Sequence, residues 1–178
     1  MGLDEIMERR ASVRRFDASR KIPHGTLMEI LGAASLAPSW KNSQTARYYA
    51  AESAEAFERV RQCLGPRNAQ NVEGASVLIV TAFEKNVAGF DKEGRPDNEL
   101  GNGWGIYDSG IGNSFVLLKA AELGADSLVM GIRDAEALRA AAGIPESQEV
   151  LAVIALGYRI TDPSRPPRKP LEEIIRIF

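Results

Sequence analysis

The chain has 178 residues, of which 44% are hydrophobic and 26% are charged, and this balance predicts one domain, residues 1–178, with a sizeable core. A formal net charge of −2 and a pI of about 5.6 argue against a general nucleic-acid binder, which carries a basic excess. No apolar run is long enough to cross a membrane, and the N-terminal stretch MGLDEIMERR lacks the apolar core of a signal peptide. We therefore expect a cytoplasmic protein with no nucleic-acid or membrane partner.

Helical and strand-like patterns alternate along the chain. Apolar residues at helical spacing predict helices over 3–10, 24–36, 54–64, 105–123 and 134–142. Runs rich in β-branched or aromatic residues predict strands over 47–51, 76–83, 126–132 and 149–158. Residues 84–103 are polar and glycine-rich and predict a long loop, whereas the proline-rich tail, 161–178, is expected to run extended before a short last helix. This alternation predicts a layered α/β or α+β domain.

Local signals mark several of these boundaries. Pro38 is expected to end the second helix, Ser53 to cap the start of the third, and Gly143 to stop the helix before the last strand. No strand is followed by G-x-G-x-x-G, so the fold is not expected to be an ordinary dinucleotide-binding one.

The chain contains one cysteine, Cys63, and one histidine, His24. A single cysteine cannot form an intrachain disulfide, a cysteine-rich zinc site or an iron–sulfur cluster. His24 is expected to start a helix, and Cys63 to be buried as a small apolar residue. We expect no metal site, and if the chain is an enzyme, its chemistry must come from carboxylates or a bound cofactor.

The segment MERRASVRRF, residues 7–16, places four arginines around Ser12. Four such charges repel one another unless an anion lies nearby. Arg10 and Arg14 are four residues apart, so they would share a face if the segment were helical. Forked cationic donors beside a hydroxyl are the groups that a phosphate monoester needs.

A second basic group, Arg165, Arg168 and Lys169, lies on the tail. The alternative interpretation of both groups is that they are solvated surface residues. For the first group, the acidic partners would then be neighbours in the sequence, namely Glu5, Glu8 or Asp17.

The stretch LAPSWKNSQTARYY, residues 36–49, inserts a polar loop between a predicted helix and a predicted strand. Its polar side chains are those of Ser39, Lys41, Asn42, Ser43 and Gln44. A turn needs fewer polar groups than this. The stretch is therefore either a solvated loop or a lip that hydrogen-bonds a polar ligand.

Taken in order, these segments resemble the nitroreductase family of flavin-dependent oxidoreductases over almost the whole chain. The more specific pieces are R-x-S-x-R, A-P-S-x-x-N-x-Q, and A-L-G-Y followed by R-K-P-L-E-E. The resemblance implies an α+β, three-layer sandwich in which helices flank a central, mostly antiparallel sheet. It also implies an intertwined homodimer in which residues 161–178 form a C-terminal arm that reaches the partner subunit.

The resemblance implies that FMN binds at the interface of the dimer. The implied FMN-binding residues are Arg10, Ala11, Ser12, Arg14, Pro38, Ser39, Asn42, Gln44, Met130, Gly131, Ile132, Arg168 and Lys169. The first four would hold the phosphate and the polar edge of the ring, and the next four would approach from the partner subunit. Residues 130–132 would line the ring, and the last two would close on the phosphate. No catalytic side chain is implied, because the flavin carries the chemistry.

The implied activity is a ping-pong reaction in which NADH or NADPH transfers a hydride to FMN and a nitroaromatic, quinone or enone is then reduced. Trp40, Trp104 and Tyr107 would pack over the open ring face, or serve as core or interface aromatics. Thr45 and Ala46 stand where family members have a proline and a large ring, so the pocket wall is expected to differ.

Three alternatives remain open at this stage. The first is a branch of the family that dehalogenates or dehydrogenates its substrate. The second is a flavin storage or sensor protein of the same fold without NAD(P)H turnover. The third is a small module without flavin that binds an acidic partner through residues 9–15.

Overall fold

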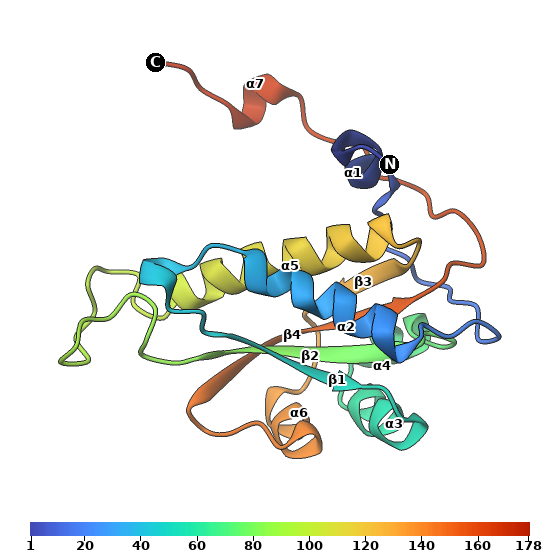
Figure 1. Ribbon diagram of the computed structural model, residues 1–178, viewed down its shortest axis with the longest axis horizontal. Coiled ribbons are helices and arrows are strands. Elements are labelled where there is room, and N and C mark those ends of the chain that lie inside the picture. The colour runs from blue at the N-terminus through green and yellow to red at the C-terminus, as the bar shows by residue number, and fades with distance from the viewer.

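The computed structural model describes residues 1–178, and it shows a twisted sheet with helices on both faces (Figure 1). The strands are β1 (Ala46–Ala51), β2 (Val77–Glu84), β3 (Asp126–Met130) and β4 (Gln148–Gly157). The α-helices are α1 (Leu3–Arg9), α2 (His24–Gly32), α3 (Ala54–Gln62), α4 (Pro66–Asn71), α5 (Gly103–Glu122), α6 (Ala135–Ala142) and α7 (Leu171–Ile174). Two short 3-10 helices, η1 (Ala33–Leu36) and η2 (Trp40–Asn42), follow α2. All predicted strands and helices are present; α4 was not predicted, because its sequence PRNAQN has no apolar period.

The sheet has the order β1-β2-β4-β3, and every pair of neighbours is antiparallel. The central strand β2 is buried from Val77 to Phe83. Its sequence is therefore an unbroken apolar run rather than an alternating one, as is typical of a strand covered on both faces. The predicted mostly antiparallel sheet is confirmed.

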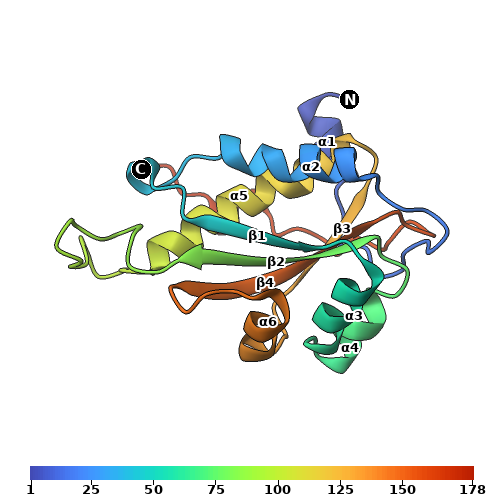
Figure 2. The same cartoon turned by 60° about the horizontal axis from the view of Figure 1, so that its bottom comes forward.

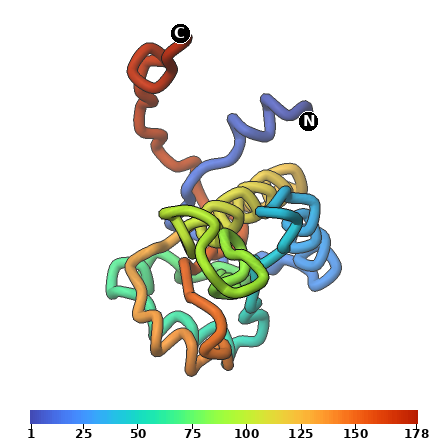
Figure 3. The backbone as a smooth tube through the Cα atoms, turned by 90° about the vertical axis from the view of Figure 1, so that its left-hand side faces the viewer, coloured from blue at the N-terminus to red at the C-terminus, as the bar shows by residue number.

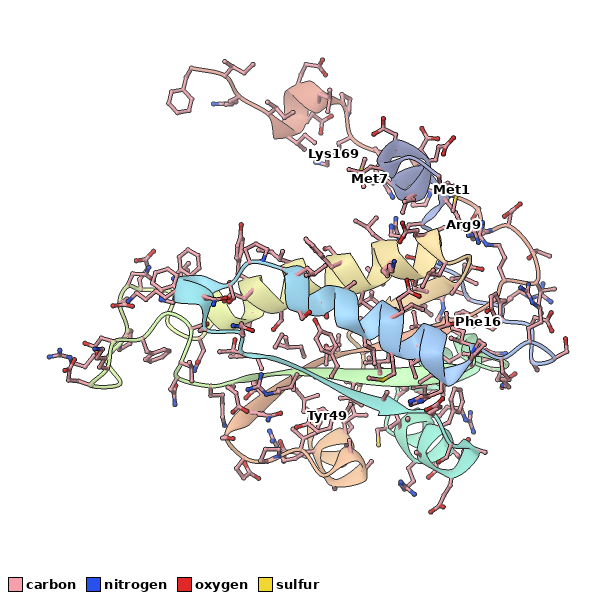
Figure 4. All side chains as sticks on the ribbon, in the orientation of Figure 1. Met1, Met7, Arg9, Phe16, Tyr49 and Lys169 are labelled. Atoms are coloured by element: carbon pink, nitrogen blue, oxygen red, sulfur yellow. The ribbon has the colours of Figure 1, made fainter.

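Helices α2 and α5 cover one face of the sheet, and α3, α4 and α6 lie on the other (Figure 2). Each interface has its own apolar core. One core includes Ile30 and Val116 from α2 and α5; the other includes Val60 and Leu138 from α3 and α6. Tyr49 points from β1 toward the second core (Figure 4). The three-layer α+β sandwich predicted from the sequence is thus confirmed.

Most local boundary predictions also hold; the exception is the predicted helix 24–36, in which the α-helix ends at Gly32 and the 3-10 helix η1 continues to Leu36. The Ser53 hydroxyl accepts a hydrogen bond from the Ala56 amide at the start of α3, and Gly143 ends α6 with φ of +65°. Helix α2 begins at His24, and Cys63 is buried.

Both ends of the chain leave the sandwich on the same side, as a short helix α1 and a long tail (Figure 3). The tail beyond residue 160 is extended except for α7, and its large apolar side chains, such as Leu171 and Ile174, are exposed. Leu3 and Met7 of α1 are exposed as well. None of the helices is both long enough and apolar enough to span a bilayer.

Candidate functional site

The arginine-rich segment is extended. Helix α1 ends at Arg9, and the Val13 amide then donates to the Ser127 carbonyl at 2.9 Å along the edge of β3. Ala11 and Val13 are buried, so the alternate residues Arg10, Ser12 and Arg14 face outward. The expected shared face of the two arginines is present, but it arises from the two-residue period of an extended chain rather than from a helix.

The tail returns to this face. Arg10 of the first segment lines a hollow of about 500 Å³ together with Arg165 and Arg168 of the tail, beside Met7 and two acidic residues of α1, Asp4 and Glu8. A neighbouring hollow of about 270 Å³ is lined by Ser12, Arg14 and Arg15 on one side and by residues 161–164 on the other. The two basic groups of the sequence are thus brought together.

Five arginines around these hollows form no ion pair with a carboxylate: Arg10, Arg14, Arg15, Arg165 and Arg168. Two of the three acidic residues that could have neutralised the first group are used elsewhere. Asp17 accepts from Ser19, which holds the pKa of this carboxyl below its ordinary value, and Glu5 accepts from the Gly2 amide. The interpretation of the first group as ordinary paired surface arginines therefore keeps only Glu8, which lines the same hollow as Arg10 but forms no ion pair with it. We call the set of five the arginine cluster.

The polar lip, residues 38–44, has an unusual backbone. Lys41, Asn42 and Gln44 all have φ between +47° and +54°, a conformation that costs a non-glycine residue of order 1 kcal/mol. Tertiary contacts hold it in place: the buried Asp108 carboxylate of α5 accepts the Trp40 amide at 2.8 Å. The Ser39 hydroxyl accepts the Gln44 amide at 3.0 Å. The backbone conformation of the lip is therefore stabilised by these contacts rather than by the intrinsic conformational preferences of its residues.

A cavity of about 290 Å³ lies between this lip, α5 and β1. Ala46 and Gly112 line it, and Thr45 lines it with a buried hydroxyl that has no hydrogen-bond partner. Tyr48 also lines it; its hydroxyl is unpartnered, and burial raises its pKa to about 12. Thr45 and Ala46, the two residues expected to alter the pocket wall, thus both line this cavity.

Beside the lip, Trp40 packs on Trp104 with 4.4 Å between ring centroids, and Tyr107 meets Trp104 edge-on at 5.7 Å. The long loop 85–102 is joined to the lip beside these rings, since its Asp97 pairs with Lys41 of the lip at 2.7 Å. The three candidate aromatics therefore form one group at the N-terminal end of α5.

The third predicted segment, Met130–Ile132, begins with the last residue of β3. Met130 is buried and turns its side chain into the core, whereas Gly131 and Ile132 are exposed. The Asn68 amide group and the Gly65 amide both donate to the Ile132 carbonyl, at 3.0 and 3.3 Å. This segment can thus present backbone and the Ile132 side chain, but not the Met130 side chain, to a ligand.

Within one chain the predicted residues form two separate groups. Arg9 donates to the Gly124 carbonyl just beyond the C-terminal end of α5, whereas the lip is fastened at Asp108 near its N-terminal end. From Asp108 to the last helical residue, Glu122, α5 rises over fourteen residues, which separates these two anchors by roughly 21 Å. Figure 4 shows Arg9 at the end where α1 and the tail leave the body, and Lys169 lies further along that tail, paired with Glu173 at 3.2 Å.

A sequence profile described as "Nitroreductase family" matches residues 7–70 and 64–158 of this chain. The chain belongs to the nitroreductase family. A protein named NADH dehydrogenase from Thermus thermophilus is 27% identical over 190 residues, which cover 94% of this chain and 91% of that protein.

Solved structures give this nitroreductase-family chain the same fold. A nitroreductase family protein from Streptococcus pneumoniae superposes with a TM-score of 0.87 at 17% identity, over 99% of this chain and 100% of that one. An oxidoreductase described as containing FMN superposes with a TM-score of 0.76 at 27% identity, over 91% of this chain and 79% of that one.

Two members of the site were not predicted. Asp108 is the carboxylate that fastens the lip, and its only signal was its place as the lone acidic residue in the apolar, glycine-rich first part of α5, GWGIYDSGIGNS. Asn68 lies in α4, which itself was not predicted, and its contact with Ile132 joins residues 64 positions apart. Spacing along the sequence cannot reveal such a contact.

Proposed function

We propose that the chain is an FMN-dependent oxidoreductase that takes reducing equivalents from NADH or NADPH and passes them to a small-molecule acceptor. The observation that carries this proposal is the arginine cluster, whose five side chains converge from two ends of the chain without a carboxylate partner. A site with this excess of forked cationic donors is suited to a phosphate group. The FMN-containing relative supports the choice of the flavin.

The residues present fit FMN. Arg10, Ser12 and Arg14 offer two guanidinium groups and a hydroxyl from one face, and the buried Ala11 gives the backbone a fixed position beneath them. Ser12 and Ser127 are bridged, and β3 runs on from Ser127 for three more residues before reaching Gly131, roughly 13 Å away. A phosphate at the first point and the far part of a ring near residues 131–132 are separated by a length that the ribityl chain and the ring can span together.

The lip would come from a second copy of the chain. Pro38, Ser39, Asn42 and Gln44 lie at the opposite end of α5 from the arginine cluster, so one small ligand cannot touch both groups within one subunit. In a homodimer the partner's lip could meet the ring, where its amide side chains supply both the donors and the acceptors that the polar edge of a flavin requires. We further propose that residues 161–178 are an arm of the single domain that binds the partner, which would cover its exposed apolar side chains.

When bound, FMN would supply the redox chemistry, accepting a hydride from the nicotinamide and giving it up to a nitroaromatic, quinone or enone. The chain's own residues would position and shield. Arg168 and Lys169 would close on the phosphate, although Lys169 must first leave Glu173. The Trp40, Trp104 and Tyr107 group would wall the pocket in which the nicotinamide and the acceptor alternate.

The visible spectrum of the freshly purified protein, recorded before and after NADH or NADPH is added under nitrogen, tests this proposal. We expect a flavin spectrum that bleaches and that recovers when an acceptor such as a quinone is added. A flavin spectrum that persists with both nucleotides would indicate storage, sensing or a branch with another reductant. A colourless protein that does not bind added FMN would refute the proposal and favour a module that binds an acidic partner.

Changing Arg10 to alanine isolates the role of the cluster. We expect weaker retention of FMN with the fold unchanged. The matched control is Lys85→Ala, which removes a cation that directly follows the last residue of β2 and is not part of the arginine cluster. Unchanged FMN affinity in the Arg10 variant would contradict the assignment of this residue.

A further inference from the structure

A buried ion pair lies directly behind the arginine-rich segment. Arg159, two residues beyond β4, places its Nε 2.9 Å from Asp126 Oδ1, and its own backbone amide donates to Asp126 Oδ2 at 2.7 Å. The Asp126 side chain is only 4% exposed and that of Arg159 is 19% exposed. The hydrogen bond to Asp126 raises the pKa of Arg159 further above its ordinary value, so this guanidinium remains charged.

The same guanidinium reaches the segment that carries the predicted phosphate ligands. Arg159 Nη2 donates to the Arg9 carbonyl at 3.2 Å, and Arg165 Nη2 donates to the same oxygen at 3.0 Å. That carbonyl belongs to the peptide bond whose amide is that of Arg10. Two guanidinium groups therefore set the orientation of the backbone where the outward-facing residues begin.

Backbone pairing extends the contact. Phe16 is bridged to Arg159, the Asp17 amide donates to the Tyr158 carbonyl at 2.8 Å, and the Ile160 amide donates to the Arg15 carbonyl at 3.2 Å. The backbone of Arg159 thus belongs to a short pairing of residues 158–160 with residues 15–17, at the C-terminal end of the arginine-rich segment. Its side chain binds the Arg9 carbonyl near the N-terminal end of that segment. Arg159 Nη1 also donates to the exposed Asp162 carboxylate at 2.7 Å, which connects Arg159 to the first residues of the tail.

We infer that Asp126 and Arg159 are positioning residues that shape the arginine cluster into a cradle for a phosphate monoester, and that they thereby make the protein select FMN over riboflavin. This inference rests on the proposed function. Neither side chain touches the ligand: Asp126 fixes the guanidinium of Arg159, and Arg159 fixes the Arg9 carbonyl and hence the direction of Arg10 and Ser12. A geometric role of this kind demands the planar fork of arginine, which lysine cannot replace.

The alternative is that the pair only stabilises the sheet edge. Breaking a buried pair destabilises a protein in either case, so stability does not separate the two roles. Binding of two ligands that differ only in the phosphate does separate them, because a general loss of structure would weaken both alike.

The experiment measures Kd for FMN and for riboflavin on the full-length protein stripped of flavin, by quenching of flavin fluorescence. The variants are Asp126→Asn and Arg159→Lys, and the matched control is Glu58→Gln, which removes the carboxylate of an ion pair with Arg61 on α3, away from the arginine cluster. We expect each of the two variants to weaken FMN binding about tenfold or more, as for loss of a charge-assisted contact, with riboflavin changed less than about twofold. The control should bind both ligands as the wild type does.

Each outcome decides a different point. An equal loss of affinity for both flavins in the two variants, or no loss for either, would overturn the inference and leave the proposed function intact. Wild-type protein that binds FMN no better than riboflavin would refute the arginine cradle itself, and the inference with it. If Asp126→Asn does not fold, Arg159→Lys, which keeps the buried positive charge, decides alone.

Discussion

Replacing Arg14 by glutamine should change the stability of the protein in opposite directions with and without FMN. In the flavin-free chain, Arg14 shares its hollow with Arg15, and its only hydrogen bond is a long one, 3.4 Å, to the Ser12 carbonyl. Unit charges roughly 8 Å apart in water repel by about 0.5 kcal/mol. Removing the charge should therefore raise the free energy of unfolding by about that amount, which corresponds to a melting temperature higher by about 1–2 °C.

With FMN the sign reverses. A hydrogen bond to a charged phosphate is worth about 1.5–3 kcal/mol, so the variant should bind FMN at least about tenfold more weakly. At an FMN concentration of about 100 times the wild-type Kd, binding stabilises the wild type by about 2.7 kcal/mol and the variant by about 1.4 kcal/mol. After the gain in the flavin-free state is added, the variant should melt about 2–3 °C below the wild type.

The assay is thermal unfolding at one protein concentration, with and without FMN, and the control is Arg59→Gln. Arg59 lies on α3 and pairs with Glu55 at 2.7 Å, so its loss should cost about 0.3–0.5 kcal/mol in both conditions. Shifts of the same sign in both conditions for the Arg14 variant would refute the reasoning. The stabilisation without FMN should also vanish in about 1 M salt, because salt screens the repulsion between exposed charges.

Three further outcomes are expected. Tyr48→Phe removes a buried hydroxyl without a hydrogen-bond partner and should stabilise the protein by about 1 kcal/mol in urea unfolding. Because burial raises the pKa of Tyr48 to about 12, the wild type should also lose more stability than the variant as pH rises from 10 toward 12. Equal dependence of stability on pH in the two proteins would contradict this. Gly74→Ala forces a Cβ atom, at φ of +81°, against the Phe16 carbonyl oxygen and should cost about 2 kcal/mol or more; Gly94→Ala, where the space is open, is the control that isolates the strain of positive φ. Removing residues 161–178 should turn a dimer into a monomer in light scattering, and a full-length protein that is already monomeric at micromolar concentration would contradict the shared site.

Most of the secondary structure could be predicted from the sequence because its signals are local. The unbroken apolar run of β2, the Ser53 cap and Gly143 each act within a few residues of the chain. The arginine-rich segment shows the limit of such signals. Its residues are compatible with a helix, but pairing of Val13 with Ser127, more than a hundred positions away, holds it extended.

The order of motifs along the chain indicated the family, and the residue types are the basis for proposing a phosphate-bearing flavin as the ligand, because phosphate and flavin need particular donors wherever they bind. Only the tertiary structure decided which charges are left without partners. Asp17 and Glu5 stand next to the arginines in sequence, yet they bind Ser19 and Gly2, while the arginines gather with the tail. Ion pairing depends on distances of a few ångströms between side chains, and those distances are set by contacts between residues such as Asp126 and Arg159, 33 positions apart, that no local pattern encodes.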